Sequence, residues 1–226
     1  MEKRYAFTLL EMIFVIVVIA IISIFMIKKE DSKTLLTKAA LQIVSDIRYT
    51  QHLALSEDHY KPGDTNWYKK RWTLIFNSDH YSDDEIAYTI FSDRAGKSRG
   101  NPDVANEVAK DPLNPKRYLS GGFTGVKELD IRKPEEFQGL RRYNIGKQYG
   151  IKEVKFSKSC SYYSSKRIEF DAFGRLLRGK LSNYTTPYPK RRVVTSQCKI
   201  TLTDKKGNEM SILIEPETGF VKISTI

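Results

Sequence analysis

Residues 7–27 read FTLLEMIFVIVVIAIISIFMI, and only Thr8, Glu11 and Ser23 in this stretch are not apolar. A helix buried in a globular protein would keep a polar face, and this segment has none. A helix of this length spans about 30 Å, which is the thickness of the hydrocarbon core of a bilayer. The segment is therefore predicted to be a transmembrane helix.

The flanks of this segment differ from those of a secretory signal peptide. A signal peptide has a shorter apolar region that ends at a small-residue cleavage site. Here the apolar run is followed directly by the charged residues 28–31, KKED. Lys3 and Arg4 precede the run, and Lys28 and Lys29 follow it, so the positive-inside rule is almost evenly balanced.

Glu11 is the unusual residue of the segment. An ionised carboxylate in the apolar core of a membrane costs about 2.5–3.5 kcal/mol on insertion scales, so it normally has a partner or a function. The leader MEKRYA at residues 1–6, the boundary between Ala6 and Phe7, and the sequence FTLLE at residues 7–11 together resemble the class III signal of type IV pilins and pseudopilins.

The resemblance implies how the N-terminus is processed. Prepilin peptidase would remove the leader after Ala6 on the cytoplasmic side, and the new N-terminal residue Phe7 would be N-methylated. The chain has Ala6 where the family almost always has Gly before the cut. In a stack of subunits, Glu11 of one would neutralise the Phe7 amine of its neighbour, because unpaired opposite charges attract strongly in a low dielectric.

Residues 28–57 continue a helical pattern without Pro or Gly. Apolar residues recur on one face at helical spacing, and the other face carries charged residues that include Asp46. We predict one continuous helix over residues 7–57, with its first half in lipid and its second half packed on a folded head. The alternative is two helices with a joint near residues 28–32.

The remainder of the chain is predicted to be rich in short strands. Aromatic and β-branched residues alternate between turn signals, which is typical of an antiparallel β-sandwich. Strands are expected at residues 71–77, 86–92, 126–131, 150–156, 166–171, 175–179, 192–202, 210–214 and 220–223. Residues 71–77 and 86–92 should form a hairpin, and residues 94–122 a long polar surface excursion.

The predicted fold class is thus α+β, with a long N-terminal helix packed on a C-terminal antiparallel β-sandwich head. The expected parts are a cytoplasmic leader (1–6), a transmembrane helix (7–27), an amphipathic helix that continues the spine (28–57) and a periplasmic head (58–226). In pattern, the helix and the C-terminal strands are similar to the H-type minor pseudopilins of type II secretion (the GspH/FimT group).

Cys160 and Cys198 are the only cysteines in the sequence. If the head faces the periplasm, which is oxidising, the two are expected to form a disulfide. The alternative is two unrelated buried thiols. No C-x-x-C motif points to redox chemistry.

Basic residues outnumber acidic ones by 38 to 27, for a net charge of +11. They crowd the second half of the chain among tyrosines, a pattern that can bind nucleic acid through phosphate neutralisation and base stacking. Lys190, Arg191 and Arg192 are the first candidates for contact with DNA. The alternative is that these charges belong to solvated outer faces.

The sequence carries no catalytic motif, so we do not expect an enzyme or a cofactor. The acidic run at residues 79–85 lacks the spacing of an EF-hand loop, which argues against a calcium site. The expected partners are other pseudopilin subunits through the N-terminal helix, prepilin peptidase and the inner membrane. The predicted function is a minor pseudopilin of type II secretion, and the alternative is a minor pilin of a DNA-uptake or type IV pilus system.

Overall fold

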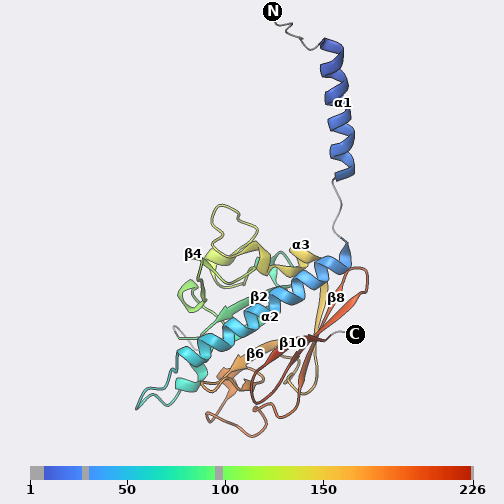
Figure 1. Ribbon diagram of the computed structural model, residues 1–226. Helices are drawn as coiled ribbons and strands as arrows, with labels where there is room; N and C mark the ends of the chain where they lie inside the picture. The colour runs from blue at the N-terminus through green and yellow to red at the C-terminus, as the bar shows by residue number, and fades with distance from the viewer. Residues whose placement is uncertain (1–7, 27–30, 95–98, 225–226) are drawn as a thin grey trace, which may run out of the picture. The chain divides into compact units, whose positions relative to one another are not determined.

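The computed structural model of the chain describes residues 8–26, 31–94 and 99–224, and the side chains of all of these except 24–26. The chain divides into two compact units, Met1–Asp31 and Ser32–Ile226. Figure 1 shows one helix in the first unit, and the sheets and other helices in the second. The predicted leader, Ala6 and Phe7 lie outside the described residues.

The first unit contains helix α1 (Leu9–Met26). Its sequence is apolar except for Glu11 and Ser23, and the Ser23 hydroxyl donates to the carbonyl of Ile19 at 2.7 Å. The Ser23 hydroxyl therefore has its hydrogen-bond partner within the helix itself. Among the described residues, no helix combines the length and the apolar character that crossing a membrane requires.

The second unit begins with helix α2 (Ser32–Ser56), which buries one face. The buried positions recur at helical spacing: Leu36, Ala39, Ala40, Ile43, Val44, Ile47, Thr50 and Ala54. The apolar face expected from the sequence is confirmed. Helices of this kind are stabilised mainly by such burial rather than by intrinsic propensity.

The predicted continuous helix over residues 7–57 is wrong. Helix α1 ends at Met26, Asp31 is not helical, and α2 begins at Ser32. The start of α2 is held by the second unit, because the Ser32 hydroxyl donates to Oδ2 of Asp204 at 2.5 Å. Of the alternative joint expected near residues 28–32, residues 28–30 lie outside the described residues. Two helices flank the point where the sequence changes from apolar to amphipathic.

Among the described residues, the second unit contains three antiparallel sheets. The first has the order β2-β1-β6-β7, with β2 (Ala87–Phe91), β1 (Thr73–Asn77), β6 (Arg167–Phe170) and β7 (Leu176–Leu177). The second has the order β10-β9-β8-β5, with β10 (Val221–Ser224), β9 (Glu209–Ile214), β8 (Cys198–Asp204) and β5 (Ile151–Phe156). The third pairs β3 (Lys110–Asp111) with β4 (Asn114–Tyr118).

The expected β-sandwich is also wrong, because α2 shares the core with the sheets. Strands of both four-stranded sheets contact α2, and Figure 1 shows this helix running across the body. A single cluster of buried residues includes Ile43 of α2, Leu74 of β1 and Ile212 of β9. The two sheets therefore bury their apolar faces with the help of a helix, rather than only against each other.

Several strand predictions can be compared with the observed elements. The hairpin is confirmed, since Leu74 of β1 pairs with Ile90 of β2 in an antiparallel register. The strand expected at residues 126–131 is wrong. That segment contains the 3-10 turn η4 (Lys127–Leu129). Val126 and Leu129 are buried three residues apart, and Asp130 and Ile131 after the turn are buried as well.

The polar excursion at residues 94–122 contains more structure than expected. Besides β3 and β4 it includes the 3-10 turn η3 (Ala105–Glu107). Val108 is buried in a small second core with Phe91, Phe123 and Leu129. This segment therefore packs on the body through a few apolar side chains within a polar sequence. A short helix, α3 (Ile145–Tyr149), follows it.

Asp46 lies at a polar cluster between α2 and the sheets, not on the solvated face that the sequence suggested. Its Oδ2 accepts a hydrogen bond from the Tyr88 hydroxyl at 2.5 Å, and its Oδ1 accepts one from Tyr143 at 2.8 Å. Burial raises the pKa of Asp46, while the two tyrosine hydrogen bonds oppose that rise. Gln42 extends the cluster, because its Oε1 accepts from Tyr149 at 2.6 Å.

Candidate functional site

The surface of α1 is uncovered on every side. All described side chains of the helix, from Leu9 to Ser23, are exposed. Leu9 is 81% exposed, Phe14 70% and Ile16 63%, although such side chains are normally buried. Covering each of them would stabilise the protein by about 1.5–3 kcal/mol. The described side chains of α1 therefore form an exposed apolar surface that contact with other apolar groups would stabilise.

Thr8 and Glu11 form a capping box at the start of α1. The Thr8 backbone N–H and hydroxyl both donate to Oε2 of Glu11 at 2.9 Å, and the Glu11 N–H donates to the Thr8 hydroxyl oxygen at 3.3 Å. The T-x-x-E spacing is the sequence signature of this motif. Glu11 thus satisfies a backbone donor at the first turn, where a negative charge also complements the helix dipole.

One oxygen of Glu11 remains available. Oε1 accepts no hydrogen bond from any described residue, and the Glu11 side chain is exposed. A cation from a second chain could therefore bind Glu11 without breaking the capping box. The predicted partner, the amine of Phe7, lies outside the described residues, so that pairing stays a prediction.

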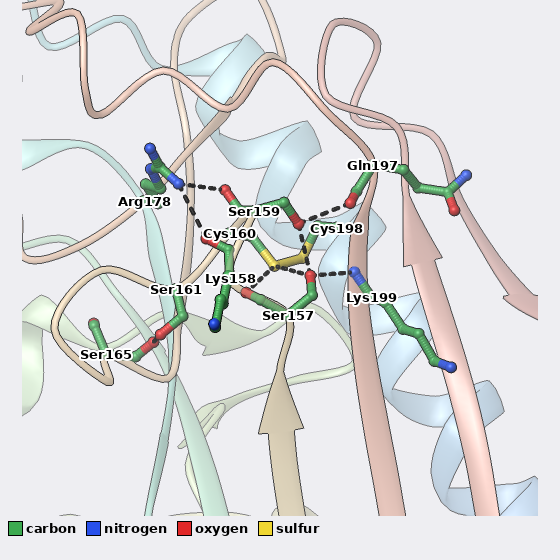
Figure 2. Close-up of a disulfide and its surroundings, with 10 residues drawn as sticks. All are labelled: Ser157, Lys158, Ser159, Cys160, Ser161, Ser165, Arg178, Gln197, Cys198 and Lys199. Carbon is green, nitrogen blue, oxygen red and sulfur yellow. Dashed lines mark hydrogen bonds between the residues drawn. A yellow bond between two sulfur atoms is a disulfide. The ribbon is translucent and has the colours of Figure 1, made fainter.

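The predicted disulfide is confirmed. Cys160 and Cys198 are joined, with their Cα atoms 5.2 Å apart and a sequence separation of 38 residues. Cys198 is the first residue of β8, and Cys160 lies in the loop that follows β5. Both residues are buried. The bond ties this loop to the start of β8, which lies between β9 and β5 in the second sheet (Figure 2).

Hydrogen bonds hold the same loop from two further sides. The hydroxyl of Ser159 donates to the Gln197 carbonyl at 2.8 Å. Arg178 Nη1 donates to the carbonyls of Lys158 and Ser159 at 3.1 and 2.8 Å (Figure 2). The Ser161 hydroxyl donates to the Ser165 carbonyl at 3.3 Å and so closes the loop on itself. The disulfide is thus the centre of a braced loop.

The three residues proposed for DNA contact do not share one environment. Lys190 and Arg191 are exposed. Arg192 is half-buried, with its guanidinium 3.6 Å from the centre of the Tyr162 ring and 5.3 Å from that of Tyr184. Arginine stacks on aromatic faces through a cation–π interaction. Two of the three side chains are therefore open to a partner, while the third packs on the protein.

The acidic run at residues 79–85 is used in local structure. Asp79 caps the 3-10 turn η2 (His80–Ser82), accepting from the N–H groups of Tyr81 and Ser82. Asp83 pairs with Lys147, and Glu85 pairs with Lys205 at 2.9 Å. Within the part of the chain that the structure describes, no three His, Cys, Asp or Glu side chains are placed to hold a metal ion.

Glu169 is a buried charge that the sequence analysis did not single out. It is fully buried in β6, and neither carboxylate oxygen has a hydrogen-bond partner among the described residues. Burial raises its pKa to about 8, although Arg167, Arg192 and Arg71 lie close enough to oppose the rise. The sequence of its strand, RIEF, gave no sign of this cluster, because Arg71 and Arg192 come from segments far from Glu169 in the sequence.

Comparisons with known protein families, with curated proteins and with solved structures find no match for this chain.

Proposed function

We propose that this chain is a pilin-like structural subunit, most like a minor pseudopilin of type II secretion. The observation that carries the proposal is α1, an apolar helix uncovered on all sides whose only charged residue, Glu11, caps its start. We infer that the full apolar segment at residues 7–27, which extends beyond the described side chains of α1, first resides in the inner membrane and then packs against identical or related helices in a filament.

The chemistry of Glu11 supports assembly through this helix. A carboxylate among apolar side chains is costly unless it is hydrogen-bonded and its charge is balanced. The capping box supplies hydrogen bonds through Oε2. A terminal amine from a neighbouring subunit at Oε1 would supply the balancing charge and would set the axial offset between subunits. The family resemblance of residues 1–11 assigns that amine to Phe7 after removal of the leader.

The disulfide supports a periplasmic location for the second unit. Disulfides persist in oxidising compartments, and the periplasm is one of them. The pairing of Cys160 with Cys198 therefore agrees with a chain whose N-terminus is cytoplasmic and whose sheet-containing unit is outside the inner membrane. In that orientation prepilin peptidase reaches Ala6 from the cytoplasmic side.

A minor pilin of a DNA-uptake or type IV pilus system is the second candidate. The exposed side chains of Lys190 and Arg191 favour it, because phosphate contacts need accessible cations. The half-buried Arg192 weakens this candidate. DNA retention by the full chain that disappears in Lys190→Gln/Arg191→Gln, with Lys152→Gln/Lys155→Gln as the matched control, would favour uptake over secretion.

The processing test is the intact mass of the protein from cells with and without prepilin peptidase. We expect loss of residues 1–6 and gain of one methyl group only when the peptidase is present. An uncut chain in both strains would refute the proposal, because no amine would then be released at Phe7.

The assembly test separates the two roles of Glu11. Glu11→Gln keeps a side chain that can accept from Thr8 but removes the charge, whereas Glu11→Ala removes both. We expect both variants to lose helix-to-helix crosslinks in membranes while the near-UV circular dichroism of the sheet-containing unit stays unchanged. Full crosslinking in Glu11→Gln would show that capping alone is needed and would overturn the charge pairing.

A further inference from the structure

A pocket of about 410 Å³ lies where β1 and β6 meet the disulfide-braced loop. Its floor includes Ile75 and Phe76 of β1, and Arg167 pairs with Ile75 in the first sheet. The remaining walls come from the loop at residues 162–165, from Lys180 and Asn183, and from Arg192. We call this cavity the basic pocket. Its lining includes no residue of α1 and none that the proposed function uses for assembly.

Four cationic side chains line the basic pocket, and no acidic side chain does. They are Lys166, Arg167, Lys180 and Arg192. Neither lysine forms an ion pair within 4 Å with any described residue. Burial, followed by the nearby charge of Arg167, lowers the pKa of Lys180. The cations therefore repel one another across a cavity that contains no compensating charge.

The acidic groups behind the pocket only partly balance this charge. Glu169 is fully buried next to Arg167, and because burial raises its pKa to about 8 it is mostly neutral at pH 7. Asp93, whose pKa burial raises to about 6, accepts from the Gly100 N–H at 2.5 Å and lies near Arg167 and Lys180. Asp103 is also near Lys180. The lining itself stays positively charged.

The loop that forms the rim adds free hydroxyl groups and backbone strain. The Ser165 hydroxyl oxygen is buried and has no hydrogen-bond partner among the described residues. Tyr163 and Ser164 adopt φ values of 50° and 57°, a left-handed conformation that is unusual for two successive residues other than glycine. Strain of this kind gathers at ligand sites, where the surroundings hold it in place. Here the Ser165 N–H donates to the Tyr162 carbonyl at 3.2 Å and closes the turn around these two residues.

We propose that the basic pocket binds the phosphate group of a phosphate monoester. A dianionic phosphate balances two of the four cations, and its oxygens can accept from the lysines and from the Ser165 hydroxyl. The cavity is larger than a phosphate group, so it has room for an organic body. Tyr163, which is 91% exposed at the rim, offers that body an aromatic surface. The ester is either a soluble molecule or the headgroup of a phospholipid.

The test uses the full chain in phosphatidylcholine nanodiscs at pH 7, titrated by calorimetry with ribose 5-phosphate and with ribose. We expect binding of ribose 5-phosphate only, and at least a tenfold loss of affinity in Lys180→Gln and in Lys166→Gln. Lys190→Gln is the matched control, because it removes the same charge from an exposed position outside the pocket. Near-UV circular dichroism checks that each variant is folded.

Three results would overturn the proposal. These are equal binding of ribose and ribose 5-phosphate, an unchanged affinity in Lys180→Gln, and an equal loss in Lys190→Gln, which would indicate diffuse attraction rather than a pocket. A single-stranded oligonucleotide that binds with equal dependence on Lys190 and Lys180 would also overturn it in favour of a nucleic-acid surface.

A second arm identifies the source of the phosphate. In nanodiscs that also contain phosphatidic acid, a headgroup in the pocket would abolish the heat of ribose 5-phosphate binding. Heat that remains would assign the pocket to a soluble ester. Both results support recognition of a phosphate group.

Discussion

Removing the Cys160–Cys198 bond should destabilise the sheet-containing unit by about 4 kcal/mol. The chain-entropy model gives this value for a closed loop of about 38 residues, because the crosslink restricts the unfolded chain more than the folded one. Both cysteines are buried, so alanine is a better replacement than serine, which would bury an unpaired hydroxyl. For a unit of this size, about 4 kcal/mol corresponds to a decrease of about 8–16 °C in Tm.

The assay is urea unfolding of the full chain in a non-ionic detergent, followed by near-UV circular dichroism. This signal reports the aromatic side chains of the second unit, where the tyrosine and tryptophan residues such as Trp72 and Tyr88 are buried. The variant Cys160→Ala/Cys198→Ala should unfold at lower urea, and dithiothreitol should not change its midpoint. The same reductant should lower the midpoint of the wild type.

A decrease of less than about 1 kcal/mol in the double variant would refute the reasoning. It would mean that the segment between Cys160 and Cys198 is already restricted in the unfolded chain, or that Arg178 and Ser159 hold the folded loop without the crosslink. Adding Ser159→Ala to the double variant separates these cases, because it removes the hydrogen bond to the Gln197 carbonyl and should lower stability further only if that bond holds the loop.

Three further changes test the interior. Tyr143→Phe removes the hydrogen bond to Asp46 and should lower the free energy of unfolding in urea by about 1.5–3 kcal/mol. The control Tyr163→Phe, at an exposed ring, should have no measurable effect. Equal effects of the two variants would show that the Asp46 cluster is not stabilising. The pKa of Glu169 rises from an ordinary 4.5 to about 8 in the folded protein, so protonation of Glu169 favours the folded state. This contribution to the free energy of unfolding is fully present below about pH 4.5. It is lost as the pH rises through 8, by up to about 5 kcal/mol. Unfolding of Glu169→Gln at pH 5 and at pH 8.5 should lack most of this dependence, and an identical pH profile in the two proteins would contradict the raised pKa. Gly179→Ala places a Cβ 2.2 Å from Nη1 of Arg192, at a φ of 87° that alanine rarely adopts. It should lower the free energy of unfolding by more than about 1 kcal/mol and change the near-UV spectrum, because Arg192 is displaced from the Tyr162 ring. An unchanged spectrum would argue against the stacking of Arg192 on Tyr162.

Local sequence patterns predicted the features that depend on residues close together in the chain. The apolar face of α2, with Leu36, Ile43 and Ile47, follows from a 3.6-residue period that any helix with a buried stripe must show. The hairpin of β1 and β2 follows from two apolar runs separated by a turn. The pattern was misleading at residues 126–131, where Val126 and Leu129 are spaced for a 3-10 turn.

The limits of local reasoning appear at the boundary between α1 and α2. Continuous helical propensity predicted one helix, whereas Ser32 starts α2 by bonding to Asp204, a residue on a strand of the second sheet. The sequence around Ser32 gives no indication that Asp204 is its hydrogen-bond partner. A tertiary contact therefore decided where the helix begins, which is a common reason for local predictions to fail.

By itself, the sequence determined the composition-driven features of this protein: the apolar segment at residues 7–27, the single carboxylate of Glu11 within it, and the presence of two cysteines that can pair. Only the tertiary structure decided which charged side chains lie close to one another. Arg167, Lys180 and Arg192 come from three segments and line one cavity, while Glu169 is buried beside them. The physical reason is that periodicity reports which face of an element is buried, whereas the energy of a charge depends on neighbours that the fold brings from elsewhere in the chain.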